Sequence, residues 1–393
     1  MDDAQSPFDG LLGDLLKILG GQAGGAPWFE SARALAVGVA TEGEAESNPD
    51  PLERIAYEQL LDVASRHVED ITGQRMPATL EVLPVTRGIW AVAQLDAWKP
   101  TIDTVVDAQA QATGASLAQL TQDPENSGVP PLFGQFANLL GPMLLGLQFG
   151  SAAGHLAERA LGNYALPLPW PRGASISIVP KNVAAFADDW SLAIDEVRLF
   201  ALTRELAGHA AFSNSSISER VTELLMAAMT DALASQAQII EKMTSSGDPE
   251  ALSAMLSDPD AMLSELVTPG AHASSSNLTA ATTALAAYID HVANAVAQKL
   301  TSNPSLLKEA WHRHRVTDGK GEQAAGALFG LDLSAKEVER GQLFISGVLE
   351  RQGEDGLALL LRGGDTLPTA AELDAPGLWL ERIALPELDS PEG

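Results

Sequence analysis

The sequence FALTRELAGHAAF, residues 200–212, lies in a helical segment that is apolar almost all round. We expect a helix over Asp195–Phe212 in the protein interior, because a helix that is apolar on every side has no face for water. Its ionisable residues beyond the first turn are Arg204, Glu205 and His209. Since an unpaired buried charge is costly, each needs a partner. Glu205 and His209 are i,i+4 neighbours and are expected to pair, whereas Arg204 needs a partner from another element.

The residues around Glu205 follow the order of a zinc-protease helix in which the metal ligands are replaced. In the motif HExxH, two histidines four residues apart bind zinc, and the glutamate between them is the general base. Here the ligand positions hold Arg204 and Gly208. His209 lies one residue late, which is ~100° of helical rotation, so it cannot simply replace a ligand at 208. The sequence therefore predicts the scaffold of a zinc site without zinc.

Two further interpretations of these charges stay open from the residues alone. A buried structural ion-pair network is favoured over a functional pocket, because such networks also perturb charges. A different metal site could use Glu205, His209, Asp290 and His291, since borderline metals accept mixed oxygen and nitrogen ligands. Asp290 and His291 are adjacent, so only one of them faces such a site well. We favour Asp290 as a partner for Arg204 instead.

Composition limits the classes of function. The chain has 393 residues, 46% of them apolar and 19% charged, as in a folded protein. Its net charge of -28 makes nucleic acid and anionic membrane surfaces poor partners. There is no cysteine, which excludes disulfides and cysteine-ligated metals. The acidic N-terminal residues do not form a secretory signal, and we expect a cytoplasmic protein.

The segment 127–157 contains no Asp, Glu, Lys or Arg, which raises the possibility of a membrane span. Prolines, polar residues and the absence of flanking basic clusters oppose that interpretation. Glycines at 146, 150 and 154 recur every four residues and let another helix approach closely. We therefore favour a buried helix with a glycine face over a membrane span.

Local signals predict a mostly helical chain with little sheet. A helix begins at Asp50-Pro51 with an aspartate cap and a capping box from Glu53, and ends at Gly73. Its expected apolar side is Leu52, Ile55, Leu60 and Val63. In 174–179 two isoleucines alternate with serines, which predicts a half-buried strand.

Further helices are expected in the rest of the chain. Trp90 and Trp98 lie in one of them, and the others cover 216–243, 278–300 and 334–353, with Ser-x-x-Glu caps at the first and last of these three. The segment 122–131 is expected to be a loop. The run Trp311–Arg315 contains His312 and His314, which we interpret as a solvated basic patch.

Several stretches resemble the actinobacterial zincin-like metallopeptidases, a family also described as hydrolases associated with coenzyme F420 biosynthesis. The resemblance rests on segments that share order and spacing with that family, and it covers most of 130–375. They are GSAAGHLAE at 150–158, LPLP at 166–169, VPKNVAAFA at 179–187, DEVRLF at 195–200, GEQ at 321–323, LFGLDL at 328–333 and LPTAAELD at 367–374.

The resemblance implies a role for each matching position. Glu205 takes the place of the general base that activates a zinc-bound water. Arg204 and Gly208 stand at the first two ligand positions. A downstream acidic ligand, in a Glu-Gly-Trp sequence of the relatives, is replaced here by Ala286. Catalytic zinc needs three protein ligands, and none of these three positions holds one. We therefore expect no zinc and no other cofactor.

These expectations combine into one prediction for the chain. We expect a single zincin-like, mainly helical domain with a small sheet over 28–385, flanked by flexible tails at 1–27 and 386–393. Its cleft, lined also by His209, Tyr288 and Asp290, is expected to bind a peptide or protein partner without catalysis. The alternatives are an atypical zinc-dependent metallopeptidase or hydrolase that uses Glu205 as general base, and a purely structural protein.

Overall fold

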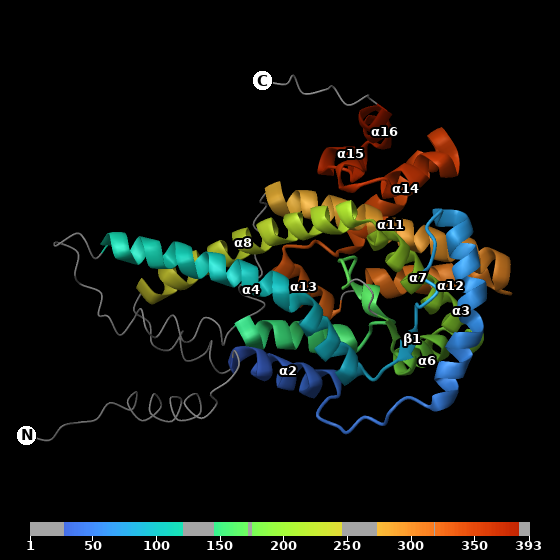
Figure 1. Ribbon diagram of the computed structural model, residues 1–393, viewed down its shortest axis with the longest axis horizontal. Coiled ribbons are helices and arrows are strands. Elements are labelled where there is room, and N and C mark those ends of the chain that lie inside the picture. The colour runs from blue at the N-terminus through green and yellow to red at the C-terminus, as the bar shows by residue number, and fades with distance from the viewer. Residues whose placement is uncertain (1–26, 121–144, 172–174, 246–272, 318, 385–393) are drawn as a thin grey trace, which may run out of the picture.

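The computed structural model describes residues 27–120, 145–171, 175–245, 273–317 and 319–384 (Figure 1). Within them the chain is predominantly helical with a two-stranded sheet, which confirms the predicted fold class. The helices and strands are α2 Pro27–Ala40, α3 Pro51–Thr72, β1 Val82–Pro84, α4 Arg87–Leu120, η1 Asn163–Ala165, β2 Ile176–Ile178, α6 Pro180–Asp189, α7 Ile194–Ser213, α8 Ser215–Ser245, α11 Ala273–Leu300, α12 Pro304–Val316, α13 Lys320–Phe329, α14 Ala335–Ala358, η2 Leu359–Leu361, η3 Gly364–Thr366, α15 Ala370–Asp374 and α16 Pro376–Ala384.

Helix α7 is the centre of the packing. It contacts α3, α6 and α11, while α11 also lies along α8 and α14 (Figure 1). From Leu199 to Phe212 every residue of α7 is buried except His209, which is half-buried. This confirms the interior helix that the apolar pattern predicts. A helix surrounded in this way can hold charged side chains only where neighbouring elements supply partners.

The sheet joins two short segments that lie far apart in the sequence. β1 pairs with β2 in parallel, with Val82 opposite Ile176 and Pro84 opposite Ile178. The prediction of a half-buried strand is wrong, because all three residues of β2 are buried. Ser177 is covered on the face expected to meet solvent, and its backbone N–H donates to Asn163 Oδ1 at 3.2 Å.

A helix over 145–157 packs closely on α2. An added Cβ at Gly146 would lie 2.6 Å from the Trp28 carbonyl oxygen, and one at Gly150 would lie 2.6 Å from that of Ala32. The predicted glycine face is thus confirmed, since any larger residue would push the two backbones apart. Among the described residues, no helix has the length and apolar character that a membrane span requires.

Helix α3 has the predicted ends but a different buried face. The Asp50 side chain accepts the N–H of Leu52 at 2.9 Å, and Gly73 closes the helix with φ 67°. The expected capping box is absent, because Glu53 pairs with Arg198 of α7. The expected apolar side is also wrong: Leu52, Ile55 and Val63 are exposed and Leu60 is half-buried, whereas Tyr57, Ala64 and Val68 are buried.

The other two predicted caps are replaced by different contacts. Asn214 Oδ1 accepts the Ser216 N–H at the start of α8, while Ser216 Oγ accepts the N–H of Gly364. Ser334 makes no side-chain capping bond, and Glu337 pairs with Arg340 instead. Ser216 therefore bonds to a residue that is distant in sequence, whereas the partner of Glu337 lies three residues along the same helix. α14 runs beyond its expected end, with Gly353 at φ 63° as the interruption.

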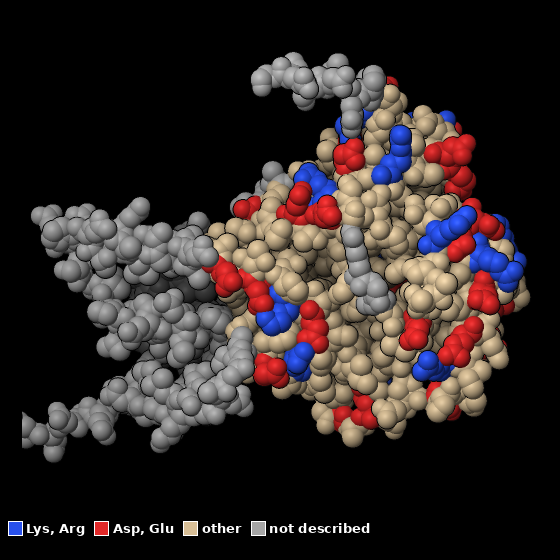
Figure 2. All heavy atoms as spheres, in the orientation of Figure 1, with Lys and Arg blue, Asp and Glu red and all other residues tan. Residues whose placement is uncertain are grey.

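One hydrophobic core extends from Phe29 to Leu380 through the described residues. Apart from Pro27, which begins α2, the predicted tails and the loop at 122–131 lie outside those residues, so the division into one domain with two tails stays a prediction. In the face shown in Figure 2, acidic and basic side chains are interspersed with uncharged surface. On that face the charge is spread out and is not gathered in one patch.

Candidate functional site

Glu205 is fully buried, at the point where α7 meets η1. One carboxylate oxygen, Oε2, accepts the backbone N–H of Tyr164 at 2.9 Å, and the other, Oε1, has no hydrogen-bond partner. Burial raises the pKa of Glu205 to about 7, against the opposing effects of the Arg204 charge and of nearby backbone N–H groups. The predicted pair with His209 is therefore wrong. Without a cation of its own, this carboxyl is half protonated near neutral pH.

Two glycines near Glu205 allow neighbouring side chains to pack directly against the backbone. A Cβ at Gly162 would lie 2.4 Å from the Glu205 carboxyl carbon. A Cβ at Gly208 would lie 2.5 Å from Cγ of Tyr164, whose ring also stacks on Phe212 with 5.8 Å between centroids. The second ligand position of the motif therefore faces an aromatic ring. A histidine side chain has no space there unless Tyr164 moves.

Arg204 stands at the first ligand position and is held from two sides. Its Nε donates to Asp290 Oδ1 of α11 at 3.1 Å, and its guanidinium carbon lies 4.2 Å from the ring centre of Trp311. The predicted pairing of Arg204 across helices with Asp290 is confirmed. Asp290 also accepts from Trp311 Nε1 at 2.8 Å and from Arg315. One carboxylate thus serves two guanidinium groups.

The charges of this cluster shift the pKa of its other members. Burial alone would raise the pKa of Asp290, but the charges of Arg315 and Arg204 outweigh it, so its pKa is lowered. Burial, together with the charges of Arg159, Arg204 and Arg315, lowers the pKa of His314 to about 3. The positive charges of the arginines thus dominate the shift of Asp290 and add to the effect of burial on His314. His314 is consequently neutral at physiological pH.

A narrow cavity of about 60 Å³ lies against this cluster. Arg204 and Ala286 line it, so the first and third ligand positions meet at its wall. Glu205 does not line it. The rest of the lining is partly apolar or aromatic and partly charged or polar. It includes Leu166, Pro167, Ile289, Leu333, Tyr164 and Trp311, together with Arg159, Arg315, His314 and Glu322.

The remaining predicted site residues diverge from this cavity. His209, Tyr288 and Asp290 do not line it. Burial lowers the pKa of His209, and it raises that of Tyr288, to which the charge of Glu354 adds. His291 also faces Glu354, with 3.1 Å between Nε2 and a carboxylate oxygen. Within the described ranges, no three His, Asp or Glu side chains are grouped as a metal site.

Sequence reasoning missed several residues of this cluster. Its interpretation of 311–315 as a solvated patch is wrong for His314 and Arg315, because His314 stacks on Trp311 at 5.1 Å between ring centres and Arg315 binds Asp290. The available signal was a tryptophan beside several cations, a combination typical of cation–π packing. For Tyr164 no local signal exists, since its place depends on the distant Gly208.

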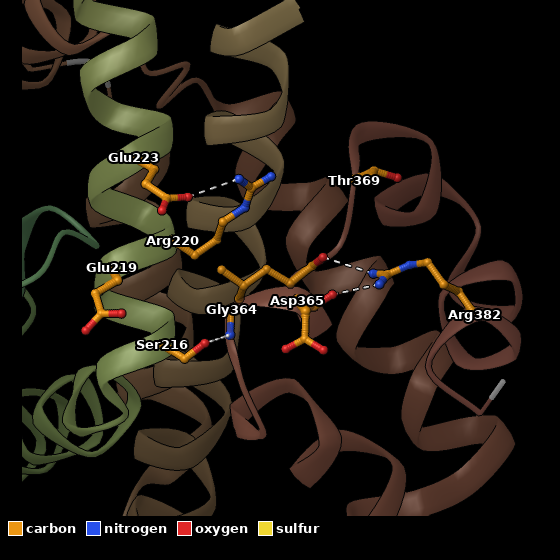
Figure 3. Close-up of a pocket in the computed structure, with 9 residues that line it drawn as sticks. Ser216, Glu219, Arg220, Glu223, Gly364, Asp365, Thr369 and Arg382 are labelled. Atoms are coloured by element: carbon orange, nitrogen blue, oxygen red, sulfur yellow. Dashed lines mark hydrogen bonds and ion pairs between the residues drawn. The ribbon is translucent and has the colours of Figure 1, made fainter. Parts of the chain in front are cut away.

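A wider hollow of about 500 Å³ lies at the start of α8 (Figure 3). None of the predicted site residues lines it. In Figure 3 Arg220 points toward Glu223, and Arg382 reaches the backbone carbonyl of Asp365. Glu219, Arg220 and Glu223 are exposed, so water weakens their electrostatic interactions with any ligand. The charges of this hollow therefore distinguish poorly between ligands of different charge.

Glu205 thus lies on an interior helix, at the position that the resemblance gives to the general base. The profile of the family "Zincin-like metallopeptidase" matches residues 29–380. The chain therefore belongs to the zincin-like metallopeptidase family. This confirms that it is a homologue of metallopeptidases, as the sequence predicts.

A solved structure supports the same fold. It is titled "Crystal structure of a putative hydrolase with a novel fold from Chloroflexus aurantiacus" and shares 19% sequence identity with this chain. The superposition has a TM-score of 0.59 and covers 93% of this chain and 99% of that chain. At this identity the likeness shows the fold alone. No curated protein matches the sequence. The actinobacterial origin and the link to coenzyme F420 stay predictions.

Proposed function

We propose that this zincin-like protein binds a peptide or protein partner and lacks zinc peptidase activity. The observation that supports the proposal most directly is the packing of the Tyr164 ring against Gly208, with 2.5 Å between its Cγ and an added Cβ. In intact relatives this position supplies a metal ligand. Here the space for that ligand is taken by an aromatic side chain.

The other two ligand positions also do not fit zinc. Arg204 is a permanent cation, which repels a metal ion, and its Nε is already bonded to Asp290. Ala286 has no donor atom. Catalytic zinc requires three protein ligands in addition to water. The residues present at these three positions therefore do not fit a zinc ion.

One observation favours the alternative, an atypical metallopeptidase. The pKa of Glu205, raised to about 7, lies in the range that suits a general base. A general base must also reach the proton that it takes. Glu205 is 0% exposed and does not line the cavity beside Arg204, so the geometry favours a structural carboxyl over a catalytic one.

The test is a measurement of zinc content and peptidase activity on protein purified without chelator. We expect far less than one equivalent of zinc and no cleavage of a mixed peptide library. Stoichiometric zinc, with a peptidase activity that chelator abolishes, would overturn the proposal.

A series of variants tests whether Tyr164 prevents zinc binding. The triple variant Arg204→His, Gly208→His, Ala286→Glu is expected to stay zinc-free, because the ring of Tyr164 blocks position 208. Adding Tyr164→Ala is expected to allow zinc binding, measured by metal analysis after dialysis. Zinc binding by the triple variant alone would show that Tyr164 is no barrier.

A further inference from the structure

The cluster around Asp290 has more positive than negative charge. Arg204 and Arg315 share the Asp290 carboxylate, while Arg159 pairs with Glu322 at 3.2 Å. All three arginines line the cavity, whereas of their two carboxylate partners Glu322 lines it and Asp290 does not. Arg204 is only 4% exposed, so water compensates little of its charge.

The neighbouring titratable groups do not remove this excess. Glu205 is next to Arg204 in sequence, but its pKa of about 7 leaves it only half ionised at neutral pH. His314 is neutral, with a pKa of about 3. Consequently the excess charge stays positive in the physiological range, and it grows as Glu205 takes up a proton at lower pH.

We propose that the cavity beside Arg204 binds a carboxylate group on a short apolar stem, the C-terminal carboxylate of a peptide or that of a small organic acid. This inference rests on the proposed binding function and names the chemistry of its ligand. The former metal site would then recognise an anion through arginine in place of zinc.

The geometry of Arg204 suits this role. Its Nε is fixed by Asp290 and its face by Trp311, whereas its two terminal nitrogens make no hydrogen bond to any residue that the structure describes. A guanidinium held in this way presents a ready fork to a carboxylate and loses little entropy when it binds.

The walls and size select a carboxylate over a bulkier anion. Much of the lining is apolar and includes Leu166, Pro167, Ala286, Ile289 and Leu333. Its volume of about 60 Å³ is enough for roughly four water-sized positions. The carboxylate group of a ligand fits that space, and its stem meets the apolar part of the lining. Inorganic phosphate has no apolar part to match it.

The test is a thermal-shift and calorimetric titration in the presence of chelator. The probes are sodium butyrate and two peptides, acetyl-Ala-Ala-Leu with a free C-terminus and its C-terminal amide, each against sodium chloride at equal ionic strength. We expect butyrate and the free-acid peptide to raise the melting temperature by about 2 °C at ten times Kd, and the amide to have no effect. Tighter binding of the peptide than of butyrate identifies a chain terminus, and equal binding identifies a small acid.

Filling the cavity provides the decisive variant, because it leaves the arginines in place. Ala286→Leu is expected to abolish the shift, and Ala286→Ser, at the same position but small, is expected to keep it. If Ala286→Leu does not fold, Ala165→Leu at the half-buried rim serves the same purpose.

Several results would overturn the inference. They are no carboxylate effect beyond that of sodium chloride, an unchanged effect in a folded cavity-filling variant, or a shift with sodium phosphate but not with butyrate. Zinc content of the same preparation decides the proposed function separately, because the carboxylate titration is done in chelator.

Discussion

The contact between position 208 and Tyr164 predicts that Gly208→Ala destabilises the protein, although alanine favours helices. An alanine Cβ would lie 2.5 Å from Cγ of Tyr164 and 2.6 Å from its Cδ2, whereas carbon atoms in contact stay ~3.5–4 Å apart. The ring would have to move by about 1 Å. It is 3% exposed, stacks on Phe212, and its backbone is bonded to Glu205, so little space is available.

The expected magnitude follows from two opposing effects. Overpacking at a rigid buried contact costs about 3 kcal/mol, the upper end of the usual range. Replacement of glycine by alanine inside a helix returns about 1 kcal/mol. We therefore expect Gly208→Ala to lower the free energy of unfolding by about 2 kcal/mol. In a Tyr164→Ala background the clash is gone, so the same change should raise it by about 1 kcal/mol.

The assay is guanidinium unfolding of the four proteins in this double-mutant cycle. The matched control is Gly38→Ala in α2, where an added Cβ meets nothing within 4 Å and alanine should stabilise in the native background. If Gly208→Ala behaves like Gly38→Ala with Tyr164 present, the ring does not fill position 208, and our proposal that this position has no room for a zinc ligand is wrong.

Two further predictions concern the buried charges. Arg204→Ala should lower the free energy of unfolding by about 3 kcal/mol in urea, near the low end for a broken buried pair, because Asp290 keeps Arg315 and Trp311; an unchanged stability would refute this. For Glu205, the folded pKa of about 7 exceeds the usual 4.5, so native stability should fall as pH rises through that window. Glu205→Gln should remove this fall and be more stable at pH 8 by about 3 kcal/mol; parallel pH curves would contradict the prediction.

Part of this fold can be predicted from the sequence, because it depends on residues that are close together along the chain. Asp50 and Gly73 set the ends of α3 through hydrogen bonds within a few residues. These bonds do not depend on what packs around the helix. The glycine spacing at 146, 150 and 154 predicts a close helix neighbour, because it places three residues without side chains on one face of a helix. By contrast, the buried face of α3 is decided by what α7 and its neighbours accommodate, so the apolar stripe in the sequence pointed to exposed positions.

The sequence by itself determined that α7 is interior, that the chain is mainly helical, and that the ligand positions of a zincin motif hold Arg204, Gly208 and Ala286. Only the tertiary structure decided how those substitutions are accommodated. Tyr164 covers Gly208, Arg315 shares Asp290 with Arg204, and Glu205 binds a backbone N–H instead of a histidine. These contacts join residues far apart along the chain, and their geometry depends on the packing of whole helices. No local pattern could specify them.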